Sequence, residues 1–207
     1  MVITYFGKSY FKLTLGDLTI AINPPSKASK APRFGSDIVL VTTNHPDYND
    51  VETVTLGSKE PFVVDGPGSF ESQGLLFTGA MSKAMIDKKE YVNTVYGFEL
   101  DGIKIGFMGI ISDESTLTPE AKEILGASDM IFVPVGGGHV FDPATAYKVA
   151  TSYGPNVIIP YEYEKDTLQR FLKEGGQEKN ETQEKATLKR RDLDGKEGNI
   201  LVLEPQA

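Results

Sequence analysis

Apolar and polar residues alternate in two early segments, 10–15 and 18–23, a pattern typical of half-buried antiparallel strands. In contrast, residues 38–41 and 130–135 form solid apolar runs, which favour strands covered on both faces. Further short apolar runs are bounded by Gly, Asn and Pro and predict strands at 1–6, 61–65, 74–79, 94–100 and 103–109. The first half of the chain is therefore expected to be mainly β.

Helix start and stop signals occur only in the second half. A Pro or capping residue begins each segment and a Gly ends it, which predicts helices at 117–128, 142–154 and 164–176. Apolar runs at 156–160 and 199–205 predict strands between and after these helices. Such an alternation favours a sheet with helices packed on its outer face.

Length and composition are those of one globular domain, predicted to span residues 1–207. Its 21 basic and 29 acidic residues give a net charge of −8, which argues against nucleic acid as a partner because Lys and Arg must neutralise phosphates. The chain has no cysteine, so any metal must be bound by nitrogen and oxygen ligands. No apolar stretch is long enough for a membrane span, and we expect a cytoplasmic protein that does not bind membranes.

The charged segment 173–199 is expected to be an exposed loop and hairpin edge. Its Lys189, Arg190 and Arg191 are interpreted as a solvated edge rather than a ligand patch. Self-association through an exposed edge is compatible with this pattern.

Candidate chemistry begins at the stretch LVTTNHPDYND, residues 40–50, where an apolar strand enters a loop carrying His45 and Asp47. Ligands alternating along a loop in this way can point toward one ion. Only one other histidine exists in the chain, His139, so a histidine-rich two-zinc centre cannot be assembled from it.

The order of these segments resembles the metallo-β-lactamase superfamily, in particular its compact lactonase-like branch of Zn-dependent hydrolases. The resemblance spans nearly the whole chain and rests on the stretches ITYFGKSYFKL, LTIAINPP, DIVLVTTNHPDYND, VVDGPGSFESQGLLFTG, TVYGFELDGIKIGFMGIISD, FVPVGGGHVFDPATAYKVA and VIIPYEYE. It implies an α/β (α+β) fold, an αββα sandwich of two mixed β-sheets flanked by helices. It also implies two metal ions that activate water.

The departures from the family pattern fall on the ligand positions. The resemblance places family ligands where this chain has Lys8, Asn23, Thr43, Tyr48, Ile110 and Glu162. Only His45 and Asp47 match motif ligands directly. The metal motif is therefore degenerate.

Two interpretations of these positions remain open. In the first, a single divalent ion, zinc, manganese or magnesium, is held by His45, Asp47, His139 and Glu162, with Asp47 catalytic. Oxygen-rich ligands would favour a harder ion such as manganese, magnesium or calcium over zinc. In the second no cofactor is bound, and the old site is a polar pocket. That pocket would be formed by Lys8, Asn23, Thr43, Tyr48, Gly137 and Gly138.

Local roles for the same residues also compete. Lys8 could fill the vacated site by pairing with Asp47, whereas Asp47 could instead cap a helix after its loop. The glycine turn 136–138 could expose N–H groups to an anion, or it could mark close backbone packing. Ser69 is interpreted as a turn residue, not a nucleophile.

Three functions follow from these alternatives. The first is a divergent protein, inactive or weakly active as a hydrolase, that binds a small-molecule ligand or a partner. The second is a metal-dependent hydrolase of an ester, lactone or phosphoester with a reduced single-metal site. A nuclease is disfavoured by the acidic charge. Whether the chain is an enzyme is left open by the sequence.

Overall fold

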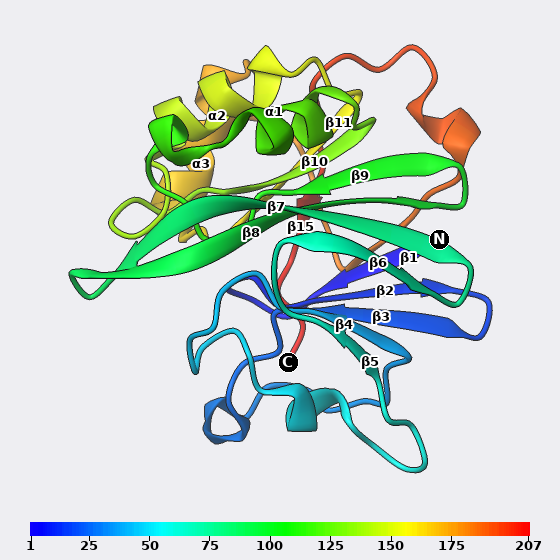
Figure 1. The fold of residues 1–207 in the computed structure, drawn as a ribbon. Helices are drawn as coiled ribbons and strands as arrows, with labels where there is room; N and C mark the ends of the chain where they lie inside the picture. The colour runs from blue at the N-terminus through cyan, green and yellow to red at the C-terminus, as the bar shows by residue number, and fades with distance from the viewer.

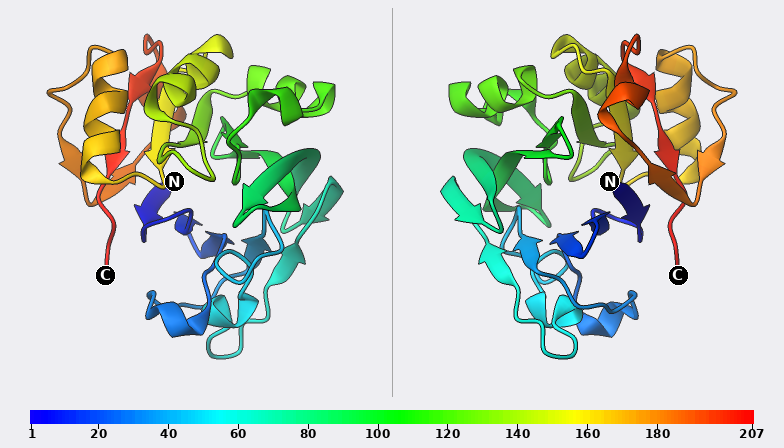
Figure 2. Two further views of the ribbon diagram at one scale, coloured as in Figure 1. Left: turned by 90° about the vertical axis from the view of Figure 1, so that its left-hand side faces the viewer. Right: turned by 90° about the vertical axis from the view of Figure 1, so that its right-hand side faces the viewer.

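The computed structural model describes the backbone of residues 1–207 and every side chain except that of Lys27. Two main sheets face each other, and three helices lie on the side of one sheet that is turned away from the other (Figure 1). The two side views of Figure 2 show the same layers. The predicted sandwich of two mixed sheets with helices is confirmed.

The six-stranded sheet is antiparallel in its first part and parallel in its second part. In spatial order its strands are β13 (Lys185–Thr187), β1 (Val2–Tyr5), β2 (Phe11–Leu15), β3 (Leu18–Ile22), β4 (Ile38–Leu40) and β5 (Phe62–Val64). The predicted charged edge at 173–199 thus contributes an edge strand, β13.

The seven-stranded sheet is also mixed, with parallel pairing at one end and antiparallel pairing at the other. In spatial order its strands are β14 (Asn199–Ile200), β11 (Val157–Tyr161), β10 (Met130–Pro134), β9 (Ile103–Phe107), β8 (Lys89–Leu100), β7 (Leu75–Ile86) and β6 (Gly68–Ser72). A small parallel pair joins β12 (Thr182–Gln183) to β15 (Val202–Leu203).

Three predictions about strands were wrong. Ser69, which was expected to be a turn residue, lies in strand β6. Strands β7 and β8 are longer than their apolar runs indicated, because they continue as a two-stranded hairpin whose faces alternate. The single strand expected at 199–205 is divided between β14 and β15, which pair in different sheets.

The helices form where the cap signals predicted them: α1 (Pro119–Gly126), α2 (Pro143–Ser152) and α3 (Lys165–Glu174). Thr118 and Asp142 accept hydrogen bonds from free N–H groups at the first turns of α1 and α2. The outer face of the six-stranded sheet is covered instead by loops with short 3₁₀ segments, including η1 (Lys27–Ser29) and η2 (Val51–Val54). Two more such segments are η3 (Glu114–Thr116) and η4 (Arg190–Leu193).

Aromatic rings fill the space between the two sheets. Phe11 of the six-stranded sheet contacts Phe132 edge-on, with ring centroids 5.1 Å apart, and Phe107 stacks on Tyr161 at 5.0 Å. All four side chains are fully buried. This core fixes the strand ends from which the candidate site loops emerge.

Candidate functional site

The candidate residues come from turns and loops that follow strands. Lys8 lies in the β1–β2 turn, Asn23 follows β3, and the loop with His45 and Asp47 follows β4. On the other sheet, Ile110, His139 and Glu162 follow β9, β10 and β11, respectively. Parallel strands bring their carboxyl ends to one edge of a sheet, which is where such folds place ligands.

An ion pair joins the first two of these segments. The Lys8 ammonium lies 3.0 Å from Asp47 Oδ2, with 58% of the Lys8 side chain and 46% of the Asp47 side chain exposed. The expected pairing of these residues is thus present. Asp47 caps no helix: only the 3₁₀ segment η2 follows its loop, and the N-cap residue there is Asp50.

Glu162 forms the buried floor of the site. Its side chain is 8% exposed, its Oε1 has no hydrogen-bond partner, and its Oε2 lies 4.0 Å from His139 Nε2. Burial raises the pKa of Glu162 to about 7, although the nearby Lys8 ammonium and a hydrogen bond from Tyr48 pull it downward. The carboxyl group therefore titrates near neutral pH.

Tyr48 and His139 connect this floor to the surface. The Tyr48 hydroxyl lies 3.3 Å from His139 Nε2, and its interaction with the Glu162 carboxyl lowers the pKa of that group. These contacts are satisfied when His139 donates from Nε2 to Tyr48 and Tyr48 donates to Glu162. Burial and the positive charge of Lys8 lower the pKa of His139, which favours its neutral form.

Left-handed backbone occurs at three replacement positions: φ is 49° at Lys8, 50° at Asn23 and 60° at Glu162. Asn tolerates this conformation, but Lys and Glu adopt it at a cost of about 1 kcal/mol or more. Hydrogen bonds hold it in place, because the Lys8 carbonyl accepts from Tyr5 Oη at 2.8 Å and from the Glu162 N–H at 3.0 Å. The two replaced ligand positions thus support each other.

A buried amide ties the β4 loop to the seven-stranded sheet. Asn93 of β8 is fully buried; its Oδ1 accepts from Thr43 Oγ1 at 3.1 Å and from the Ile110 N–H at 2.8 Å. Its Nδ2 donates to Ser82 Oγ and to the Met108 carbonyl. Sequence analysis missed this residue; the available signal was a lone Asn inside a run of strand-forming residues.

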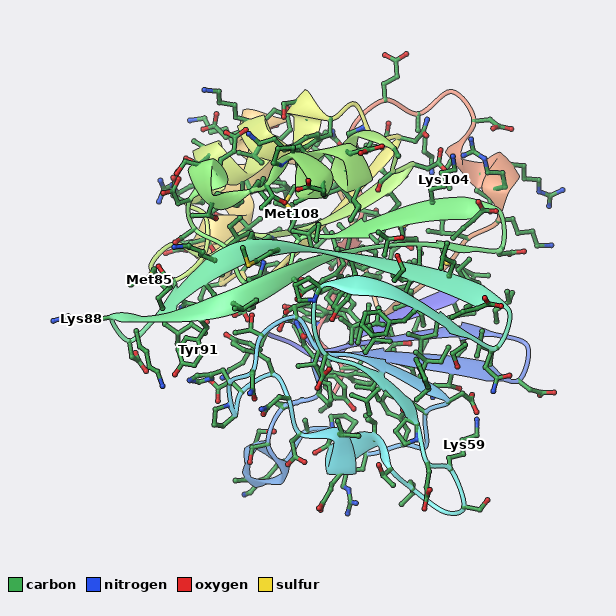
Figure 3. The ribbon with its side chains drawn as sticks, in the orientation of Figure 1. Lys59, Met85, Lys88, Tyr91, Lys104 and Met108 are labelled. Atoms are coloured by element: carbon green, nitrogen blue, oxygen red, sulfur yellow. The ribbon has the colours of Figure 1, made fainter. Side chains whose placement is uncertain are left out.

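His45 lies beside two aromatic rings and the backbone of Asp47. Its ring meets Tyr91 edge-on at 5.4 Å and Tyr48 at 5.8 Å, measured between centroids, and its Nδ1 accepts the Asp47 N–H at 3.2 Å. Figure 3 shows Tyr91 on the β7–β8 hairpin, whose tip carries Lys88. Tyr48 contacts both His45 and His139, so the two histidines lie on either side of the same tyrosine.

The remaining predicted pocket residues have internal partners. Asn23 hydrogen-bonds the Thr42 side chain and backbone, at 2.9 Å and 2.8 Å. In the glycine turn, the N–H groups of Gly136 and Gly137 both donate to the Phe141 carbonyl, so they are not presented to an anion. A Cβ at Gly136 would lie 2.5 Å from the Glu162 carbonyl oxygen, which makes this a close-packing turn. Gly138 follows it with a left-handed φ of 69°.

The residues present do not fit a metal ion as a group. Over residues 1–207, with the Lys27 side chain set aside, no three or more His, Cys, Asp or Glu side chains are placed to hold one. The physical reasons are visible at each candidate. Asp47 already pairs with an ammonium, and His45 Nδ1 already accepts a hydrogen bond. His139 and Glu162 approach each other without a third donor.

A family model described as "Beta-lactamase superfamily domain" matches residues 2–162, which is most of the chain. Together with the fold, this match places the protein in the metallo-β-lactamase superfamily: the chain belongs to this family. None of the helices within the described part of the chain is long and apolar enough to cross a membrane.

Particular relatives carry names that mention metal-dependent hydrolysis. A UPF0173 metal-dependent hydrolase of Thermococcus onnurineus (strain NA1) is 22% identical over 78% of this chain and 84% of its own. A solved structure from Thermotoga maritima, described as a Zn-dependent hydrolase of the metallo-β-lactamase superfamily, is 26% identical with a TM-score of 0.73 and 98% coverage of both chains. Igni18, a metallo hydrolase from Ignicoccus hospitalis KIN4/I, shares the fold at 19% identity and a TM-score of 0.63, covering 100% of this chain and 96% of its own.

Proposed function

We propose that this protein has exchanged metal-dependent hydrolysis for metal-free binding of a small polar ligand. The ligand would bind at the inherited pocket, by which we mean the site formed by Lys8, Asp47, Tyr48, His139 and Glu162. The observation that carries the proposal is the Lys8 ammonium 3.0 Å from Asp47, the one carboxylate that matches the family motif. The protein's own cation takes the place of an external one.

Electrostatics favours this arrangement. An ammonium and a divalent ion repel each other, and the double charge of the ion doubles the repulsion, although solvent screens it because 58% of the Lys8 side chain is exposed. Asp47 shares its single negative charge with Lys8, so the two residues together present no net charge to attract a divalent ion. The buried Glu162 is half neutral near pH 7, because its pKa is about 7, and contributes less than a full charge.

The exposed parts of the pocket can still recognise a ligand. Lys8, Asp47 and His139 present an ammonium, a carboxylate and an imidazole to solvent, above a floor of Tyr48 and Glu162. A polar molecule with both hydrogen-bond donors and acceptors suits such a set, since each of these groups prefers a charged or polar partner.

Calorimetric titration with zinc, manganese and magnesium chlorides tests the role of Lys8. We expect no stoichiometric binding to the unchanged protein and measurable binding to Lys8→Met, in which Asp47 is freed. Lys59→Met is the matched control. Lys59 also forms an ion pair, with its Nζ 2.7 Å from Asp37, and neither residue belongs to the candidate ligands. Tight binding of one ion to the unchanged protein, lost in Asp47→Ala, would contradict the proposal.

A second candidate function is metal-dependent hydrolysis with a reduced single-metal site. The unpartnered, buried Glu162 Oε1 favours it, because such an atom is a vacant ligand position. The relatives named above are described as metal-dependent hydrolases. Turnover of p-nitrophenyl acetate, γ-butyrolactone or bis(p-nitrophenyl) phosphate that requires added metal and disappears in Asp47→Ala would establish this function; no turnover would exclude it for these substrate classes.

A further inference from the structure

The outer face of the seven-stranded sheet carries a row of small residues away from the inherited pocket. Strand register places Ser69 beside Thr78, Thr78 beside Gly97 and Gly97 beside Gly106, so one row crosses β6, β7, β8 and β9. The neighbouring row on the same face carries larger residues, each two positions away from a member of the small row. These are Leu76 on β7, Glu99 on β8 and Lys104 on β9. Small side chains between taller neighbours leave a trench.

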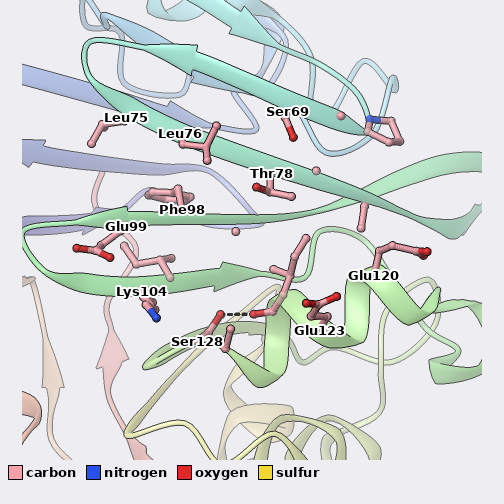
Figure 4. Close-up of a pocket in the computed structure, with 18 of the residues that line it drawn as sticks. Ser69, Leu75, Leu76, Thr78, Phe98, Glu99, Lys104, Glu120, Glu123 and Ser128 are labelled. Atoms are coloured by element: carbon pink, nitrogen blue, oxygen red, sulfur yellow. Dashed lines mark hydrogen bonds between the residues drawn. The ribbon is translucent and has the colours of Figure 1, made fainter.

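Helix α1 closes one side of this trench. A Cβ added at Gly97 would lie 2.7 Å from Ile124 Cγ2, and one at Gly106 would lie 3.2 Å from Leu125 Cδ2, so the helix rests directly on the glycine row. The resulting groove has a volume of about 1060 Å³ and is bordered by β6, β7, β8, β9 and α1 (Figure 4). None of the inherited pocket residues lines it.

The lining combines an apolar surface with an acidic rim. Leu76 and Ile124 line the groove, and 60% of Leu76 is exposed to solvent. Three carboxylates, those of Glu99, Glu120 and Glu123, border it together with a single ammonium, that of Lys104. The described residues provide no ion-pair partner for Glu120 or Glu123.

We propose that this groove binds a slender amphiphile, with an apolar chain in the trench and a protonated amine at the Glu120 and Glu123 rim. The charge excess on the rim favours a cation over an anion or a neutral head group. An apolar groove with a few convergent polar groups is typical of small-molecule sites, which usually enclose about 300–1,000 Å³.

The width of the trench favours a small molecule over a protein helix. Helix α1 rests on the glycine row, and the row of Leu76, Glu99 and Lys104 lies two strand residues to one side of it, which corresponds to about 7 Å. An α-helix with its side chains is about 10–12 Å across and cannot enter such a trench. An alkyl chain or a flat ring can enter the trench and make carbon contacts at about 3.5–4.0 Å on either side.

The test uses octylammonium chloride, with sodium octanoate and methylammonium chloride as probes matched in chain and in head group. Each is titrated into the full chain and followed by backbone ¹⁵N–¹H NMR shifts. We expect octylammonium to shift the amides of Thr78, Gly97 and Ile124, with at least tenfold weaker binding of octanoate and of methylammonium.

Two variants localise the effect. Thr78→Trp fills the trench with a residue that strands accept, and we expect at least a tenfold loss of octylammonium affinity. Met85→Trp, at an exposed position of the β7–β8 hairpin, is its control and should bind normally. The double variant Glu120→Gln, Glu123→Gln should bind octylammonium about threefold to tenfold more weakly. The double variant Glu174→Gln, Glu178→Gln removes the same charge elsewhere and should keep the affinity of the parent protein.

Several outcomes would overturn the proposal. These are equal binding of octanoate, shifts that map outside the groove, or unchanged affinity in Thr78→Trp while its fold is intact by NMR. Tighter binding in the groove of a 14-residue Leu/Lys amphipathic helical peptide than of octylammonium would also overturn it, because the groove would then be a protein-docking surface.

Discussion

The inherited pocket and the outer groove are opposite in construction. In the pocket, the replaced ligand positions carry long polar side chains that bond one another, as Lys8 does with Asp47 and Tyr48 with His139. In the groove, residues such as Thr78 and Gly97 are too small to meet across the sheet. The comparison teaches that polar side chains at the motif positions can pair with their neighbours, while a sheet face forms a groove where its side chains are small.

The largest expected difference between these regions concerns Asn93 and Thr78. Replacing Asn93 by Ala leaves Thr43, Ser82, the Met108 carbonyl and the Ile110 N–H without their partner, so we expect a loss of about 4 kcal/mol in the free energy of unfolding. Thr78→Ala, on the groove floor, should change it by less than about 0.5 kcal/mol. Urea denaturation measures both; equal effects would remove the contrast between a bonded pocket and an open groove.

The next effect is the pH dependence caused by Glu162. Its pKa rises from 4.5 to about 7 on folding, so the folded state binds the proton more tightly than the unfolded chain. The contribution of Glu162 to stability is therefore fully present below about pH 4.5 and is lost as pH rises through about 7, by roughly 3 kcal/mol in total.

Glu162→Gln should remove this slope. The free energy of unfolding of the variant, relative to that of the parent protein, should rise by about 3 kcal/mol from pH 4.5 to pH 8. Urea denaturation at both pH values measures it. Glu178→Gln, at an exposed position, is the control and should leave the slope unchanged. Parallel pH profiles for parent and Glu162→Gln would mean that the carboxyl group is ionised and compensated in the folded protein.

A smaller effect is expected at Tyr48. Tyr48→Phe keeps the buried ring but removes the hydroxyl that bridges His139 and Glu162, which should cost about 1 kcal/mol. The same change should raise the pKa of Glu162 further, because the hydrogen bond from Tyr48 lowers it. A pH titration of the Glu162 carboxyl carbon by NMR checks this direction, and a lower pKa in the variant would refute the bridge.

The smallest effect concerns the ion pair itself. Both Lys8 and Asp47 are about half exposed, so a double-mutant cycle with Lys8→Met and Asp47→Asn should give a coupling energy of about 0.5 kcal/mol that decreases with salt. A small coupling energy would agree with the proposal that the pair acts on metal binding rather than on stability. A coupling energy of several kcal/mol would show that it is a structural element instead.

Much of the fold could be predicted from the sequence because its signals are local. The Thr118 and Asp142 caps and the apolar runs of β10 and β11 each predict their own element. Strand β6 could not be predicted this way, because Gly68 and neighbouring polar residues become a strand only by pairing with β7.

The candidate site was predictable in outline but not in its contacts. Ligand positions follow from the order of motifs, and the pairing of Lys8 with Asp47 follows from opposite charges in one pocket. The role of Asn93 depends on the register that sets β8 beside the β4 loop through the Thr43 bridge. The groove likewise depends on register, because Ser69, Thr78 and Gly97 are far apart in sequence and only pairing aligns them.

The central claim is that the inherited pocket is closed to metal by the protein's own cation. Elemental mass spectrometry on protein purified without chelators or metal-affinity resin, after incubation with zinc, manganese and magnesium salts, tests it most directly. The account predicts far less than one ion per chain for the parent protein and a higher content for Lys8→Met. About one ion per chain in the parent protein, lost in Asp47→Ala, would contradict it.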